Sequence, residues 1–230
     1  MEPQPDRFAG PPPRERIFNA PLLAVLVAAS MPALYFFQER SRDNWMGLSF
    51  SPADLTQGHY GGLITAMLVH ANWAHALTNA VGALTFGAPV ARLFRGAVGV
   101  GVFFALYIGA GIFGSLGYAA LHLGSTDPLV GASGAVFGLI GAATRLLGGG
   151  GRVLPLTSRA VITTSIAWMA VNAVVGLIGF APGVDGARIA WEAHAFGFLF
   201  GILAIGPLAR LFARPDERFD SSGSLGDPLP

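Results

Sequence analysis

The hydrophobic positions of the chain gather into six long stretches, which are separated by polar or glycine-rich segments. A helix needs about 20 predominantly apolar residues to cross the roughly 30 Å hydrocarbon core of a bilayer. The pattern predicts spans at about 17–37, 63 or 72 to 93, 97–121, 133–147, 160–180 and 191–212. We therefore expect an all-α membrane protein with six transmembrane helices.

The fourth predicted span is shorter than the others. About 15 residues, at a rise of 1.5 Å per residue, reach roughly 22 Å, which is less than the thickness of a bilayer core. We expect a short central fourth helix that begins inside the membrane, with Ser133 below the membrane surface. Four consecutive glycines at 148–151 end this span.

Polar segments flank the predicted membrane domain, which covers residues 17–212. Residues 1–16 and 213–230 are polar and rich in proline or charge, a composition typical of disordered tails. The segment 38–60 between the first two spans is long for a simple connection. We expect this first loop to be structured and functional.

Composition agrees with a membrane protein and excludes several kinds of chemistry. Only 12% of the residues are charged and 53% are hydrophobic, whereas a soluble domain carries about 25% charged residues. The formal net charge of +1 argues against a nucleic-acid partner. The chain contains no cysteine, which excludes disulfides and thiol nucleophiles. All fourteen basic residues are arginines, so we also expect no lysine base.

The arginines are distributed unevenly between the loops. Eleven lie in the two tails and in the second and fourth loops, and the other three are Arg40, Arg42 and Arg188. Positive residues favour the cytoplasmic side of a membrane. We therefore expect a multi-pass protein of a bacterial inner membrane, with both termini in the cytoplasm.

Ser133 stands at the start of the fourth span between two glycines, Gly131 and Gly134. Glycine permits close backbone approach and dihedral angles that other residues avoid. Gly134, Gly138 and Gly141 recur at i, i+4 and i+7, which leaves one helix face without side chains. Small residues at this spacing allow another membrane helix to pack closely.

The sixth predicted span carries a matching face. Gly197 and Gly201 follow His194 at i+3 and i+7. If the two glycine faces pack together, His194 comes within hydrogen-bond distance of Ser133. A serine hydroxyl is a weak nucleophile until a base removes its proton, and histidine is the usual base.

Acyl transfer also needs hydrogen-bond donors where the oxyanion develops. His75 and Asn79 lie four residues apart in the second span, so they share one helix face. These two side chains and the backbone N–H of Ser133 are the candidate donors.

A carboxylate partner for His194 is hard to identify in the sequence. Glu192 is only two residues away and so points to a different helix face, whereas Asp127 and Asp185 lie in predicted loops. A Ser–His dyad is the economical interpretation.

Each candidate also has a structural explanation. Ser133 could serve only helix packing, His194 could make an interhelical hydrogen bond, and Asn79 could hold two helices together. His70 could cap the junction between loop and helix, and we expect His59 and His122 to be solvated loop residues. Ser133, His194 and the His75/Asn79 pair occur together on three separate spans, which favours a catalytic role over a purely structural one.

At this point the chain resembles the rhomboid family of intramembrane serine proteases. The resemblance covers roughly residues 58–206. Gly-x-Ser-Gly alone is a weak signal, but three motifs in this order on these spans are highly specific. The motifs are Gly-x-Ser-Gly at 131–134, Ala-His-x-x-Gly at 193–197, and His-x4-His-x3-Asn formed by His70, His75 and Asn79.

The resemblance implies a rhomboid-like bundle and a role for each of these residues. Ser133 is then the nucleophile and His194 the base, while His75 and Asn79 stabilise the oxyanion. His70 matches the first-loop histidine of the family and is expected to have a structural role.

Two departures from the family pattern are visible. Many members carry Trp-Arg just before the second span, where this chain has glycines at 61–62, so the anchoring of the first loop is open. Phe137 replaces the common Tyr four residues after the nucleophile. Ring stacking on the base is expected to survive this change, and any contact through the hydroxyl is lost.

The resemblance implies a serine endopeptidase that cleaves single-pass transmembrane proteins within the lipid bilayer. We expect no cofactor and no metal, because two histidines and an asparagine are a poor ligand set. The oligomeric state is left open. The alternatives are a non-enzymatic protein that binds transmembrane segments, and a small transporter or channel. A transporter should show ionisable residues deep in several spans or an internal repeat, and we find neither in the sequence.

Overall fold

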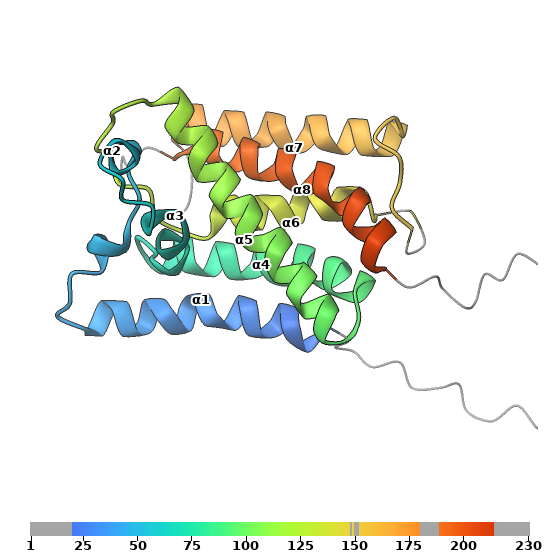
Figure 1. Ribbon diagram of the computed structural model, residues 1–230, viewed down its shortest axis with the longest axis horizontal. Coiled ribbons are helices and arrows are strands. Elements are labelled where there is room, and N and C mark those ends of the chain that lie inside the picture. The colour runs from blue at the N-terminus through green and yellow to red at the C-terminus, as the bar shows by residue number, and fades with distance from the viewer. Residues whose placement is uncertain (1–19, 148, 150–151, 180–188, 214–230) are drawn as a thin grey trace, which may run out of the picture.

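The computed structural model describes residues 20–147, 149, 152–179 and 189–213, and the regular secondary structure of these residues is helical apart from one isolated β-bridge (Figure 1). The predicted tails at 1–16 and 213–230 lie outside the described residues, apart from Ala213. The long helices are α1 (Leu22–Arg40), α4 (Trp73–Leu93), α5 (Gly96–Leu121), α6 (Ser133–Thr144), α7 (Arg159–Ile178) and α8 (Trp191–Phe212). The short ones are η1 (Trp45–Leu48), α2 (Pro52–Thr56), α3 (Gly62–Thr65) and η2 (Ala66–Leu68).

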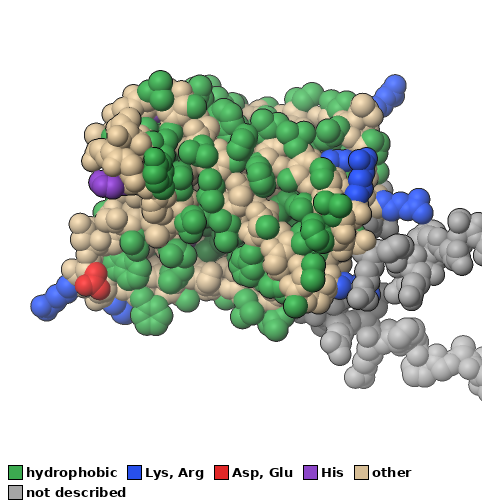
Figure 2. Space-filling model, viewed as in Figure 1, with side chains coloured by type: hydrophobic (Ala, Val, Ile, Leu, Met, Phe, Trp, Pro, Cys, Tyr) green, Lys and Arg blue, Asp and Glu red, His purple; other side chains and the backbone are tan. Residues whose placement is uncertain are grey.

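Four of these helices, α1, α5, α7 and α8, are long and apolar enough to cross a membrane. Helix α6 is apolar but has only 12 residues. Helix α4 has 21 residues and carries the polar side chains of His75 and Asn79 near its start. Hydrophobic side chains cover most of the face shown in Figure 2, as expected for a surface in contact with lipid. The structure therefore confirms an all-α protein with apolar helices, while the count of six spans stays a prediction.

The observed boundaries differ from the predicted ones mainly in the first half of the chain. Helix α1 begins at Leu22 and continues to Arg40, three residues beyond the predicted end. Helix α4 begins at Trp73, since the side chain of Asn72 accepts a hydrogen bond of 2.8 Å from the backbone N–H of His75 and caps the helix. The later start of the predicted second span is therefore the correct one.

Helix α6 occupies the middle of the bundle (Figure 1). It packs against α4, α5 and α8, and nine of its twelve residues are buried. Its first residue is Ser133 and its last is Thr144. A helix of 12 residues thus lies within the predicted fourth span, and its N-terminal end carries the candidate nucleophile. That it is the short central helix of a six-span membrane bundle stays a prediction.

The glycine faces of α6 and α8 pack backbone against backbone. A Cβ atom added at Gly201 would lie 1.8 Å from the carbonyl oxygen of Gly138, and one added at Gly197 would lie 2.1 Å from that of Gly134. A Cβ at Gly141 would lie 2.2 Å from the carbonyl oxygen of Phe198. No side chain fits at these positions, so the predicted close approach of the two helices is present in the structure.

The first loop is folded, as its length predicted. Phe50 is fully buried, and its backbone forms an antiparallel bridge with Leu129, the residue four positions before Ser133. The side-chain amide of Gln38 pairs with the backbone of His70 in both directions, at 2.7 and 3.1 Å. A Cβ at Gly62 would lie 2.6 Å from the carbonyl oxygen of Ser49. The glycine at this position therefore lets η1 and α3 approach closely, and this contact anchors the first loop.

We predict that Gly201→Ala destabilises the protein, because the added methyl group would collide with backbone that no rotamer change can move. Overpacking of this kind costs about 1–3 kcal/mol. The measurement is thermal unfolding in detergent micelles. Gly101→Ala on α5 is the matched control, since a Cβ there meets nothing within 4 Å. Equal stability of the two variants would show that α6 and α8 are not in close contact.

Candidate active site

Ser133 and His194 form the centre of the candidate site. The Oγ atom of Ser133 lies 2.8 Å from Nε2 of His194, across the contact between α6 and α8. Both side chains are half-buried. The hydrogen bond joins residues 61 positions apart in the sequence, so it depends on the glycine contact that holds the two helices together.

The ring of His194 is fixed on two further sides. Its Nδ1 atom lies 2.9 Å from Oδ1 of Asn172 on α7. The ring of Phe137 stacks on the imidazole with a centroid distance of 4.4 Å and an interplanar angle of 4°. The stacking predicted for Phe137 is therefore present. A histidine held in this way has little rotational freedom.

His75 reaches the site from α4. Its ring lies against Gly131, where an added Cβ would be 2.5 Å from Nε2. Gly131 also has φ = +109°, a conformation that side chains disfavour. Both properties require glycine two residues before Ser133. The backbone N–H of Ala71 points to Nδ1 of His75 at a long 3.5 Å, an arrangement that leaves Nε2 free to donate.

Asn79 lies one turn further along α4 and is only 5% exposed. Its Nδ2 atom has no hydrogen-bond partner among the described residues. An unsatisfied buried donor is costly, and such groups often have a functional explanation. A bound oxyanion would satisfy this donor.

His70 lies just before α4 and is completely buried. Neither ring nitrogen has a partner among the described residues, and the ring stands edge-on to that of His75 at a centroid distance of 5.3 Å. Burial, and then the neighbouring His75, lower the pKa of His70 to about 4. The ring is therefore neutral at pH 7 and packs against the ring of His75; its structural role stays a prediction.

Sequence reasoning missed Asn172. The search for a partner of His194 was restricted to carboxylates, whereas the structure brings a neutral amide to Nδ1. The available signal was a single asparagine within an apolar stretch of the fifth predicted span, since polar residues inside membrane helices are functional candidates. Its pairing with His194 could not be derived, because the two residues lie on different helices.

One expectation for the loop histidines was wrong. His122 is not simply solvated, because its Nε2 atom lies 3.2 Å from a carboxylate oxygen of Glu192 and its ring stacks on Tyr118 at 4.3 Å. Glu192 thus points away from His194, as predicted, and links the start of α8 to the end of α5. His59 and Asp127 are exposed, as expected for loop residues, and Asp185 lies outside the described residues.

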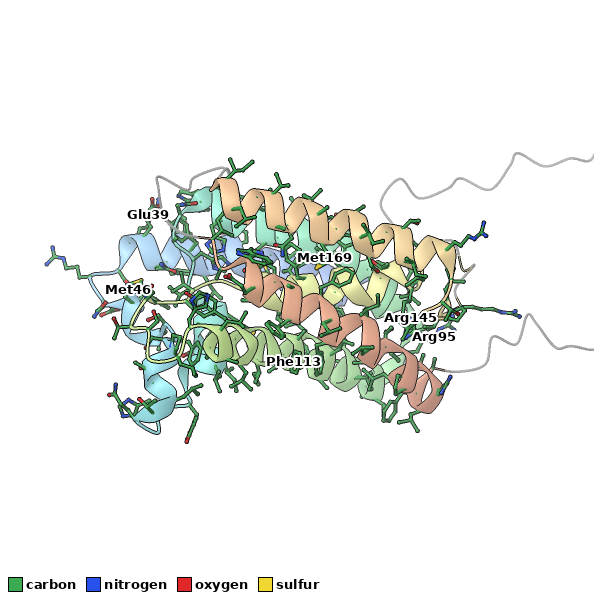
Figure 3. All side chains as sticks on the ribbon, turned by 90° about the horizontal axis from the view of Figure 1, so that it is seen from above. Glu39, Met46, Arg95, Phe113, Arg145 and Met169 are labelled. Carbon is green, nitrogen blue, oxygen red and sulfur yellow. The ribbon has the colours of Figure 1, made fainter. Side chains whose placement is uncertain are left out.

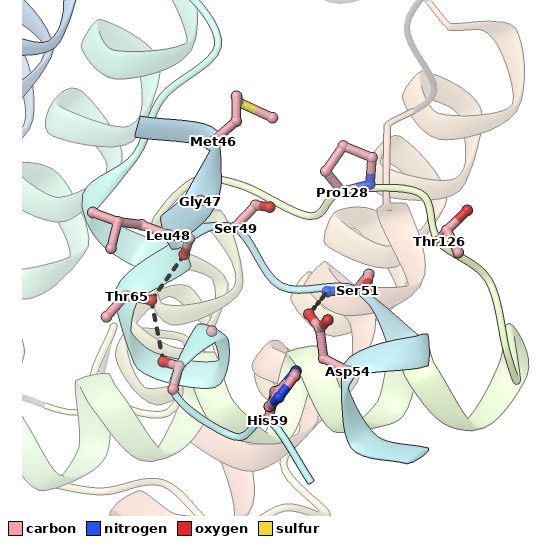
Figure 4. Close-up of a pocket in the computed structure, with 12 residues that line it drawn as sticks. Met46, Gly47, Leu48, Ser49, Ser51, Asp54, His59, Thr65, Thr126 and Pro128 are labelled. Atoms are coloured by element: carbon pink, nitrogen blue, oxygen red, sulfur yellow. Dashed lines mark hydrogen bonds between the residues drawn. The ribbon is translucent and has the colours of Figure 1, made fainter. Parts of the chain in front are cut away.

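A separate hollow lies in the first loop (Figure 4). It is lined by residues between Met46 and Thr65, together with Thr126 and Pro128. Thr65 donates to the carbonyl oxygen of Leu48 at 2.8 Å, and the backbone N–H of Ser51 donates to Asp54 at 2.7 Å. The lining includes none of the predicted site residues, so this hollow belongs to the loop framework.

Comparison with known families and proteins agrees with the geometry. A family model described as the rhomboid domain matches residues 57–211. A curated protein of Bacillus subtilis (strain 168), named "Putative rhomboid protease YdcA", is 28% identical over 166 residues, which are 70% of this chain and 72% of the relative. The matched domain contains every predicted site residue from His70 to Gly201.

We predict that Ser133 reacts with a fluorophosphonate probe, because His194 can accept the proton of the hydroxyl as Oγ attacks phosphorus and fluoride leaves. His194→Ala should abolish labelling, measured by fluorescence of the labelled band and by peptide mapping. Ser115→Ala removes another buried serine, on α5, and should leave labelling unchanged. Labelling at another serine, or full labelling without His194, would contradict the assignment.

Proposed function

The chain belongs to the rhomboid family, and from that premise we propose that it is an intramembrane serine endopeptidase that cleaves membrane proteins in or near their transmembrane segments. The observation that carries the proposal is the 2.8 Å contact between Ser133 Oγ and His194 Nε2 inside an apolar helical bundle. The chain is an integral multi-pass membrane protein, and its family acts on membrane-protein substrates.

In the proposed reaction Ser133 is the nucleophile and His194 the general base. His194 Nε2 takes the hydroxyl proton while Oγ attacks the scissile carbonyl carbon. The resulting imidazolium then protonates the leaving amine nitrogen as the C–N bond breaks, which leaves an acyl group on Ser133. A water molecule, deprotonated by the same Nε2 atom, attacks the acyl carbon and releases the second product with free Ser133.

Three donors are proposed to bind the oxyanion of the tetrahedral intermediate. They are Nε2–H of His75, the Nδ2 amide group of Asn79 and the backbone N–H of Ser133. Support comes from the position of His75 beside Gly131 and from the unpartnered amide nitrogen of Asn79. The Ser133 N–H belongs to the first turn of α6, where backbone donors lack intrahelical acceptors. Preorganised donors at this point lower the barrier to acyl transfer.

We further propose that α4 and α6 complete a set of six transmembrane helices in a bacterial inner membrane. The start of α6 carries Ser133, and its end adjoins Arg145. Figure 3 places Arg95 and Arg145 at one end of the bundle, and Glu39 and Met46 at the other. The positive-inside rule assigns the arginine-rich end to the cytoplasm. Ser133 then lies toward the outer side, and both termini are cytoplasmic.

The proposed substrate is a single-pass transmembrane protein. A helix presents its carbonyl groups in hydrogen bonds, so the substrate must unwind locally before Ser133 can attack. Glycine or proline near the cleavage position should help, because these residues weaken helices by about 1 and 3 kcal/mol, respectively. The chemistry requires neither a metal nor a cofactor. The Ser133–His194 contact favours the peptidase over a protein that only binds transmembrane segments.

We predict that Ser133→Ala and His194→Ala each abolish cleavage of a model transmembrane substrate in proteoliposomes, while both variants fold like the wild type. The assay is the appearance of the cleaved fragment on a gel, and folding is checked by thermal unfolding. The first substitution removes the nucleophile and the second removes the base. Wild-type turnover by Ser133→Ala would disprove the proposed function.

We also predict that His75→Ala and Asn79→Ala slow cleavage without abolishing it. Loss of one oxyanion donor typically costs on the order of 10²–10³ in rate, and the backbone donor of Ser133 remains in both variants. The relevant quantity is kcat for the same substrate. If both variants retained the wild-type kcat, the two residues would have a packing role only.

A further inference from the structure

Asn172 is distinctive in its helix. Only two residues of α7, Val161 and Asn172, are buried, and Asn172 is 4% exposed. Much of the helix presents apolar side chains outward, such as Ile166 and Leu177. A polar side chain that is buried in such a helix needs partners. Asn172 has two, and both belong to the first turn of α8.

The orientation of the Asn172 amide follows from these two partners. Nδ2 lies 2.8 Å from the carbonyl oxygen of Trp191, which can only accept a hydrogen bond. The amide oxygen must therefore face His194, where it lies 2.9 Å from Nδ1. Because this oxygen can only accept, Nδ1 carries the proton. The neutral imidazole then has its lone pair on Nε2, the atom that faces the hydroxyl group of Ser133.

Two neighbours on the same face of α7 support this arrangement. Trp168, one turn before Asn172, stands edge-on to Phe137 at a centroid distance of 6.4 Å, and Phe137 stacks on His194. Gly176, one turn after Asn172, makes room for Trp191, because a Cβ there would lie 2.4 Å from Cβ of Trp191. Trp168, Asn172 and Gly176, at i, i+4 and i+8 of α7, thus position the ring of His194 and the first turn of α8.

We propose that Asn172 is a positioning residue of the peptidase reaction, which fixes the tautomer and the ring orientation of His194 and completes a Ser133–His194–Asn172 relay. This inference rests on the proposed function. The amide accepts the hydrogen bond that an aspartate accepts in other serine hydrolases. It does so without placing a negative charge in the apolar bundle, where an ionised group is strongly disfavoured.

The test compares Asn172→Ala with a matched control, Ser165→Ala. Ser165 lies on the same helix and bonds only locally in the structure, to the carbonyl oxygen of Val161 at 2.7 Å. In Asn172→Ala the Nδ1–H group loses its acceptor, so kcat should fall roughly 5- to 150-fold with little change in KM. The acidic limb of the kcat–pH profile should move to lower pH, because the imidazolium loses the same acceptor. His75 on α4 and the Glu192–His122 pair are retained in both variants.

A second measurement needs no substitution at Asn172. In ¹⁵N-histidine-labelled wild-type protein at neutral pH, the NMR signals of His194, identified by their absence in His194→Ala, should show the proton on Nδ1. A proton on Nε2 overturns the proposal, even if Asn172→Ala fails to fold. An unchanged kcat and pH profile in folded Asn172→Ala also overturns it, as does an equal loss in Ser165→Ala.

The proposed function is tested separately in the same experiment. Cleavage by the wild type together with inactive Ser133→Ala supports the peptidase, whatever Asn172→Ala does. If the wild type neither cleaves the substrate nor reacts with a fluorophosphonate, the peptidase assignment fails. The position of the imidazole proton still reports on the role of Asn172 in orienting His194.

Discussion

The close backbone contact between α6 and α8 is the constraint on which the candidate site depends. At Gly197 and Gly201 an added Cβ would lie about 2 Å from the carbonyl oxygens of the facing helix, so the backbones of the two helices are in direct contact there. Ser133 and His194 sit at the same end of this contact and meet at 2.8 Å. Because misplacement by about 1 Å can cost roughly 100-fold in rate, the glycines would set the geometry of the proposed dyad as well as the packing of the two helices.

The polar groups inside the bundle divide into two sets. One set is fully paired: the carbonyl oxygen of Trp191, the amide of Asn172, the imidazole of His194 and the hydroxyl of Ser133 form a continuous chain of hydrogen bonds. Buried networks of this kind are rigid when every member is satisfied. The other set is open, since the amide nitrogen of Asn79 and both ring nitrogens of His70 have no partner among the described residues. The paired groups hold His194, the proposed base, and the amide nitrogen of Asn79 is the donor that the proposed reaction offers to the substrate carbonyl.

Sequence reasoning reached much of this arrangement because the decisive signals are local. The apolar stretches gave the long helices, and α8 begins at Trp191 as predicted. Glycine spacing led to the Ser133–His194 contact. The contact of Asn172 with His194 could not be predicted. It depends on how α7 is rotated relative to α8, and residue spacing within one helix does not report that rotation. The start of α4 was ambiguous for a related reason. Asn72 caps α4, and the apolar residues before it form the separate short helices α3 and η2 rather than an extension of α4.

The neutrality of the proposed Ser133–His194–Asn172 relay determines how the membrane potential acts on it. Each elementary charge that moves through the full membrane potential exchanges about 2.3 kcal/mol per 100 mV. Ser133, neutral His194 and Asn172 carry no formal charge at rest, whereas an ionised aspartate in place of Asn172 would carry one. A uniform field across the membrane therefore exerts no net force on the resting Ser133–His194–Asn172 relay.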